Sequence, residues 1–82
     1  MDSSHVSKTI YGLIQSGRYS DAIPLLGRII QANSRNATAR YVLSFALANM
    51  GDRREALSQV QESLRIDPDS KPARDLLDAL QK

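Results

Sequence analysis

The 82-residue sequence contains no cysteine, no tryptophan, and only one histidine. Without cysteine, the chain can form neither a disulfide bond nor a thiolate metal site. The histidine, His5, lies close to the N-terminus, where chain ends commonly fray, so it is a poor candidate for a metal ligand or a general base. We therefore expect no enzymatic activity and no metal or cofactor.

The sequence also lacks a long apolar run and a targeting segment. No apolar stretch approaches the ~20 residues that a membrane-spanning helix needs. The first eight residues, MDSSHVSK, lack the basic start and apolar stretch of a secretory signal. We expect a soluble, cytoplasmic protein without a membrane partner, and a chain of this length has room for one small domain.

Charge of one sign is not concentrated anywhere in the sequence. The formal net charge is +2, with five Lys/Arg against two acidic residues in 1–50 and six against seven in 51–82. Arg18, Arg28 and Arg53 are spaced as solvent-facing helix residues. The sequence also lacks the interleaved basic and aromatic residues that are typical of single-strand binders. We therefore do not expect nucleic-acid binding.

The chain repeats its own pattern at a shift of 34 residues. The segment SGRYSDAI at 16–23 is echoed by MGDRREAL at 50–57. The match preserves apolar character more than identity, as stacked structural units require, because each unit must bury one face against the next. The matched pairs are Tyr11 with Phe45, Leu13 with Leu47, Gly17 with Gly51, Asp21 with Glu55, Ala22 with Ala56, Ile23 with Leu57, Leu26 with Val60, and Ile30 with Leu64.

Apolar residues within each copy recur at helical spacing. Gly17 and Gly51 follow the first apolar segment of each copy, and glycine adopts with least cost the positive φ that ends many helices. Spacings of three and four residues predict the buried face of a helix at Val6, Ile10, Leu13 and Ile14 in the first copy, and at Leu43, Ala46, Leu47 and Met50 in the second.

A second helix is expected directly after each glycine turn. Asp52 followed by Glu55 is typical of a capping box, in which each side chain accepts a hydrogen bond from a free backbone N–H. The small side chains of Ala22 and Ala56 lie where the paired helices should approach most closely. Each copy is therefore predicted to be a helical hairpin.

A last helix is expected at the C-terminus. Pro68 ends the second copy, and Ser70 can cap a further helix whose first turn tolerates Pro72. That helix has one apolar and one polar side, which is typical of a terminal cap over the core of the last repeat. Asn36 begins an Asn-Ala-Thr glycosylation pattern, but without a secretory signal we interpret it as a helix cap.

The period and the glycine turns resemble those of the tetratricopeptide repeat family, and the resemblance covers nearly the whole chain. The second copy departs from the family pattern at Arg40, where the usual residue is Trp, and at Ser44, where it is Gly. The first copy is more degenerate. The residues of the second copy that match the pattern are Leu43, Gly51, Ala56 and Pro68.

The resemblance implies an all-α fold of antiparallel helix-turn-helix repeats, stacked as a short right-handed α-solenoid of about five helices. We expect a single domain over 1–82. Repeat 1 is placed at about 3–36, repeat 2 at about 37–70, and the capping helix at about 71–82.

Members of this family usually hold peptides or partner proteins in a concave groove lined by the first helix of each repeat. The resemblance therefore implies a non-catalytic module that binds a protein or peptide partner. We expect that partner to place apolar side chains on Tyr11, Ile14, Tyr41 and Phe45. The positions that would line the groove are Tyr11, Ile14, Gln15, Tyr41, Phe45 and Asn49, with Ser4, Ser7, Thr38, Ala48, Pro72 and Asp75 also facing it.

Two alternatives stay open at this point. In a solenoid of only two repeats, Tyr11 or Tyr41 can pack between neighbouring helices with its hydroxyl at the rim. The same apolar face can also pair with another copy of the chain, which would make this a self-association module. Two repeats are fewer than the three that independent stability usually needs, so the domain can equally be part of a larger scaffold protein.

Overall fold

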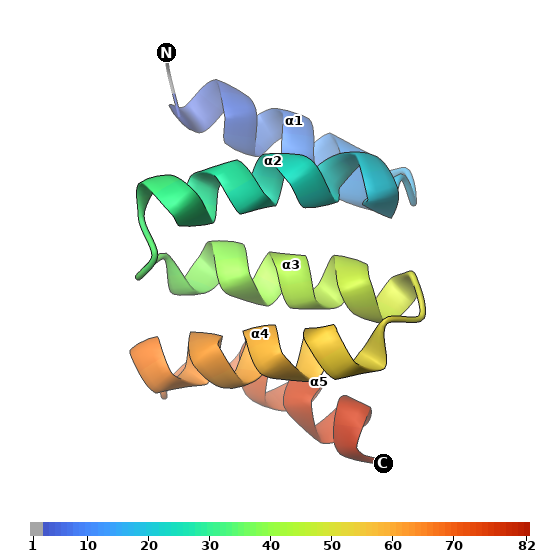
Figure 1. The fold of residues 1–82 in the computed structure, drawn as a ribbon, viewed down its shortest axis with the longest axis vertical. Coiled ribbons are helices and arrows are strands. Elements are labelled where there is room, and N and C mark those ends of the chain that lie inside the picture. The colour runs from blue at the N-terminus through green and yellow to red at the C-terminus, as the bar shows by residue number, and fades with distance from the viewer. Residues whose placement is uncertain (1–2) are drawn as a thin grey trace.

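The computed structural model describes the backbone of residues 3–82 and the side chains of residues 9–82. Every regular element within this part of the chain is an α-helix, and the helices follow one another in a single stack (Figure 1). The all-α prediction is therefore confirmed. The five helices are α1 (Ser3–Gln15), α2 (Tyr19–Ala32), α3 (Ala37–Asn49), α4 (Arg53–Ile66) and α5 (Lys71–Gln81).

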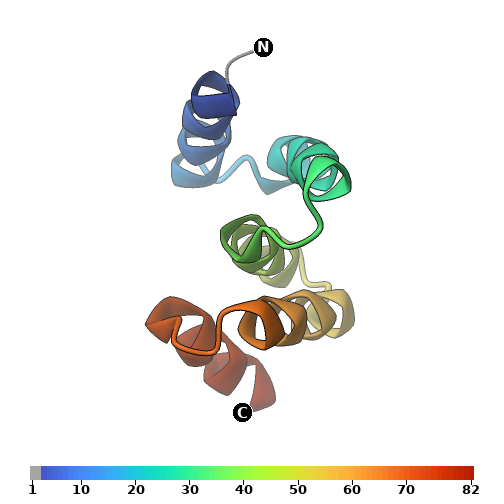
Figure 2. The same cartoon turned by 90° about the vertical axis from the view of Figure 1, so that its left-hand side faces the viewer.

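The stack has two sides. Figure 2 shows α1 and α5 on one side and α2 and α4 on the other, with α3 between them. Each helix packs on the one that follows it in sequence, and α3 also contacts α5. This zigzag of helical hairpins is consistent with a short solenoid of the kind that the 34-residue period predicts.

The two glycine turns behave as the sequence predicts. Gly17 and Gly51 have φ of 76° and 87°, the left-handed region that only glycine enters without strain. In each turn a backbone N–H reaches back to close the helix end, from Arg18 to the Leu13 carbonyl and from Asp52 to the Leu47 carbonyl. The same turn is thus built twice, at equivalent positions of the two copies.

Side-chain caps begin three of the helices. Asn36 accepts from the Ala39 N–H at 3.0 Å, and Ser70 accepts from the Ala73 N–H at 3.3 Å, so both predicted caps are confirmed. Asp52 likewise accepts from the N–H of the third residue of its helix, at 3.2 Å. These side chains satisfy backbone donors that the helices themselves leave free.

The reciprocal half of the predicted capping box does not form. The Glu55 carboxylate accepts a hydrogen bond from the Gln59 side-chain amide at 3.2 Å, and the Asp52 N–H is already used by the Leu47 carbonyl. Because the Asp52 N–H is bonded within the glycine turn, the Glu55 carboxylate instead accepts from Gln59, which lies four residues further along the same helix.

The core lies along the line where α2, α3 and α4 meet. Ala22 and Ala56 are fully buried, which agrees with their predicted place at the closest helix approach. Two serines join α3 to α4 inside this core: the Ser44 hydroxyl donates to the Ala56 carbonyl at 2.5 Å, and the Ser63 hydroxyl donates to the Ala37 carbonyl at 2.8 Å. Each buried hydroxyl therefore has the partner that its burial requires.

Among the residues of the predicted apolar stripes whose side chains the structure describes, which exclude Val6, one lies outside the core. Met50 is exposed, because α3 ends at Asn49 and Met50 already belongs to the turn. The helical period therefore predicted the stripe correctly up to the last turn and failed where the helix stops.

Candidate protein-binding groove

An apolar recess of about 560 Å³ opens between α1 and α3. The side chains of Leu26 and Ile29, from α2, also line it, so three helices enclose the recess. We call it the α1/α3 recess. The residues that line it are Ile10, Tyr11, Ile14, Leu26, Ile29, Asn36, Thr38, Ala39, Tyr41, Val42 and Phe45.

The lining of the α1/α3 recess carries no charge. Its polar groups are the hydroxyls of Tyr11, Thr38 and Tyr41 and the amide of Asn36, whose oxygen already caps α3. A charged group placed in such a recess would lose its hydration without gaining a partner. The recess is therefore suited to apolar side chains.

A second, shallower recess of about 450 Å³ lies between α3 and α5. It shares Tyr41 and Phe45 with the first recess, so these two rings form the ridge between them. Its other lining residues include Lys71 and Asp75, which form an exposed ion pair at 3.3 Å. The two recesses thus differ in chemistry, since the first is uncharged and the second is charged at its rim.

Phe45 is held in place by an aromatic neighbour that the sequence did not indicate. The ring of Tyr19, at the start of α2, meets the Phe45 ring edge to face, with 6.0 Å between the centroids. This geometry is one that aromatic pairs prefer. This contact restrains the Phe45 ring, which is one of the two rings of the ridge.

The predicted site residues fall into two groups. Tyr11, Ile14, Tyr41 and Phe45 all line the α1/α3 recess. Gln15 and Asn49 are exposed and line neither recess; the Asn49 amide donates to the Phe45 carbonyl within α3. Of the remaining predicted positions, Thr38 lines the α1/α3 recess and Pro72 and Asp75 line the second recess, whereas Ala48 lines neither. The side chains of Ser4, His5 and Ser7 lie outside the described residues.

The aromatic side chains differ in exposure. Tyr11 is 65% exposed, whereas Tyr41 and Phe45 are half-buried. Tyr41 packs against the core, and Phe45 packs against Tyr19. Both interpretations made from the sequence therefore apply in part. Tyr11 presents most of its surface to solvent, and the two rings on α3 combine a packing role with a place in the recess.

The sequence did not single out the residues that form the floor of the recess. These residues are Ile10, Leu26 and Ile29, and each belongs to the apolar stripe of its helix. Ile10 and Leu26 are nearly fully buried. The stripe shows that a residue faces the stack, but not whether the neighbouring helix covers it. That distinction depends on the distance between α1 and α3.

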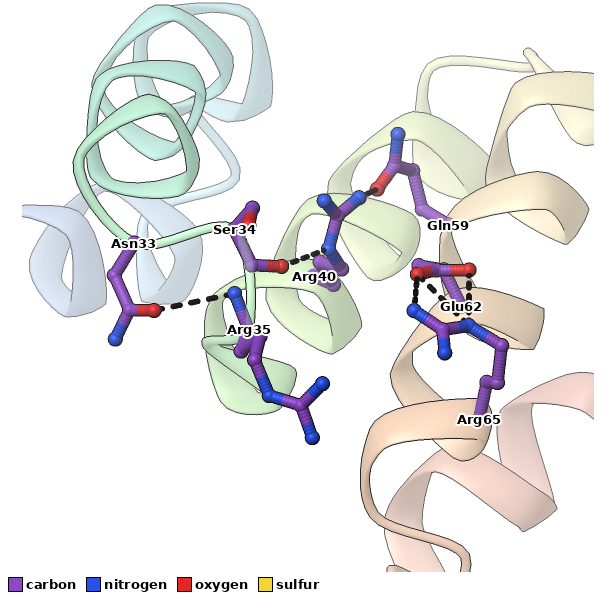
Figure 3. Close-up of polar contacts among 7 residues, drawn as sticks. All are labelled: Asn33, Ser34, Arg35, Arg40, Gln59, Glu62 and Arg65. Atoms are coloured by element: carbon purple, nitrogen blue, oxygen red, sulfur yellow. Dashed lines mark hydrogen bonds and ion pairs between the residues drawn. The ribbon is translucent and has the colours of Figure 1, made fainter.

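Arg35, Arg40 and Arg65 come from the α2–α3 loop, α3 and α4, and lie around the place where these elements face one another (Figure 3). None of the three lines either recess. Arg40 occupies the position of the usual family Trp. Its guanidinium donates to the Ser34 carbonyl at 2.9 Å and to the Gln59 side-chain oxygen at 3.0 Å. A hydrogen-bonded bridge between loop and helix thus takes the place of aromatic packing.

Glu62 and Arg65 complete this cluster with an ion pair on α4. The hydrogen bonds from Arg65 lower the pKa of the Glu62 carboxyl, and the positive charges of Arg65, Arg40 and Arg35 lower it further. The carboxylate stays ionised and balances part of the positive charge around it. The contacts in this cluster join elements of the fold to one another and do not converge on an open cavity.

Two other kinds of feature, a membrane-spanning helix and a metal-binding cluster, are absent from the described part of the chain. No helix among the described residues is long and apolar enough to cross a membrane. No group of three or more His, Cys, Asp or Glu side chains from the same residues is placed to hold a metal ion.

Comparison with known proteins gives one family match. The model of a family described as "Tetratricopeptide repeat" matches residues 13–80. The match covers the C-terminal end of α1, all of α2, α3 and α4, and α5 except its last residue. Comparison with curated proteins gives no match.

Proposed function

Because the chain belongs to the tetratricopeptide repeat family, which generally mediates protein–protein interaction, we propose that it binds an apolar segment of a partner protein in the α1/α3 recess. The observation that carries this proposal is the uncharged recess of about 560 Å³, with the largely exposed Tyr11 on one wall. Small proteins seldom leave a large apolar surface uncovered without a use for it.

The partner segment is expected to insert side chains rather than to lie flat. An aromatic side chain can bury ~150–250 Å², and at ~25 cal/mol/Å² each one contributes several kcal/mol before the cost of association is subtracted. With few such residues in the recess, we expect micromolar rather than nanomolar affinity. Leucine or phenylalanine side chains from one face of a helix would suit the recess best.

A photo-crosslinking experiment tests the proposed site. A photoreactive phenylalanine analogue at position 11 should form a crosslink to a different protein in a cell extract. The crosslinked segment of that protein should be rich in apolar residues. The matched control places the same analogue at Arg54, which is exposed on α4 and lines neither recess. The crosslinked peptides are identified by mass spectrometry. Equal crosslinking from both positions would show that the recess is not the site.

Self-association is the second candidate function, since the same recess can receive a side chain from another copy. Sedimentation of the free domain over a hundredfold concentration range separates the two candidates by mass action. If the recess binds a foreign partner, as proposed, the free domain should be a monomer at every concentration. A dimer that persists at the lowest concentration, with position 11 crosslinking only to a second copy, would favour self-association.

A further inference from the structure

Helix α1 is attached to the stack less extensively than the other helices. Its packing on α2 is the least extensive between any two consecutive helices of the described chain. In the second repeat α3 contacts α5, but α1 makes no contact of similar extent with α3, and Figure 2 shows α1 standing clear of it. The space between them is the α1/α3 recess.

The buried side chains show the same difference between α1 and α3. Among residues 9–15 of α1, only Ile10 is buried, whereas four side chains are buried among the equivalent residues 43–49 of α3. Helix α3 is also joined to α4 by the buried bonds of Ser44 and Ser63 described above. Because apolar burial supplies most of the stability of a packed helix, the described part of α1 is held more weakly than the equivalent part of α3.

The sequence of α1 adds little intrinsic stability. The segment SSHVSKTIYGLIQ contains three serines, one threonine and one glycine, all weaker helix formers than the leucine, glutamate and arginine that are common in α4. Gly12 is exposed, and a methyl group added there would meet no atom within 4 Å. The tertiary contacts and the local propensity of α1 are therefore both weak.

We infer that α1 opens as a separate unit while α2–α5 stay folded. Local opening of weakly packed elements, at a free energy below that of global unfolding, is a general property of native proteins. Here the opening removes one whole wall of the recess, with Ile10, Tyr11 and Ile14. If the proposed function is correct, a partner binds only the closed form, and its apparent affinity falls with the fraction of molecules in which α1 is docked.

Amide hydrogen exchange on the full chain tests this inference without any partner. The measurement uses conditions in which exchange reports the opening equilibrium. The amides of residues 9–15 should exchange at least tenfold faster than the slowest amides of α3 and α4. Equal protection in all three helices would overturn the inference.

Two glycine substitutions make the test sharper. At both Gly27, in α2, and Gly12 an added methyl group meets nothing within 4 Å, so alanine should stabilise either helix and slow exchange about two- to fivefold. Gly27→Ala should slow the slowest amides of α2–α4 and leave residues 9–15 unchanged, because α2 stays folded when α1 opens.

Gly12→Ala is the matched control. It should slow exchange at residues 9–15, since it stabilises the closed form against the opening of α1, and it shows that an effect of this size can be measured there. If Gly27→Ala instead slows residues 9–15 by the same factor as α2–α4, then α1 opens only with the whole domain and the inference is wrong. The proposed binding site does not depend on that result.

Discussion

Replacing Ala56 by leucine is expected to lower the free energy of unfolding by about 1–3 kcal/mol, as overpacking of a tight core does. Ala56 has no exposed surface, and its carbonyl accepts the hydrogen bond of the buried Ser44 hydroxyl on α3. Three more carbon atoms at this point must push α3 and α4 apart, which also strains that bond. In a small domain this is a large share of the total stability.

Thermal unfolding followed by circular dichroism measures the effect. A loss of 1 kcal/mol corresponds to roughly 4–8 °C in Tm for a domain of this size, so the variant should melt at least several degrees lower. The matched control is Ala79→Leu, because Ala79 is exposed on α5 and the added side chain has room. An unchanged Tm for Ala56→Leu would argue against the close helix approach.

Replacing both Tyr41 and Phe45 by alanine is expected to weaken partner binding by about 2 kcal/mol or more, which is a loss of roughly 30-fold in affinity. The two rings form the ridge between the recesses and lie one helical turn apart on α3. Binding energy in protein interfaces concentrates in a few large, central side chains of this kind.

The folded state of this double variant has to be measured alongside its affinity. Phe45 also packs against Tyr19, so we expect the helical circular dichroism to persist and Tm to fall by a few degrees. Arg18→Gln and Arg53→Gln are the controls; both arginines are exposed and line neither recess, so affinity should change little. Normal binding by the folded double variant would place the site on another face.

Tyr11→Ala keeps the test decisive if the double variant unfolds. Tyr11 is 65% exposed and contributes little to the core, so its removal should leave Tm nearly unchanged. A loss of affinity in this variant would still locate the partner in the α1/α3 recess. Unchanged affinity, together with unfolding of the double variant, would assign the aromatic residues on α3 to the core alone.

The sequence by itself determined the helices and the turns. The positive φ of Gly17 and Gly51 and the caps made by Asn36 and Ser70 all follow from residues within a few positions of one another. Such features depend on local sterics and on short hydrogen bonds, which each segment carries wherever the rest of the chain lies. The 34-residue repeat then indicated how many hairpins the chain would stack.

Only the tertiary structure decided which apolar residues line an open recess and which are covered. The helical stripe placed Ile10 and Ile14 toward the stack, but the recess exists because α1 stands clear of α3 while α5 contacts it. The contact between the Tyr19 and Phe45 rings could not be predicted for the same reason. The distance and angle between two helices are set by many weak contacts over the whole interface. They cannot be predicted from any one segment of the sequence.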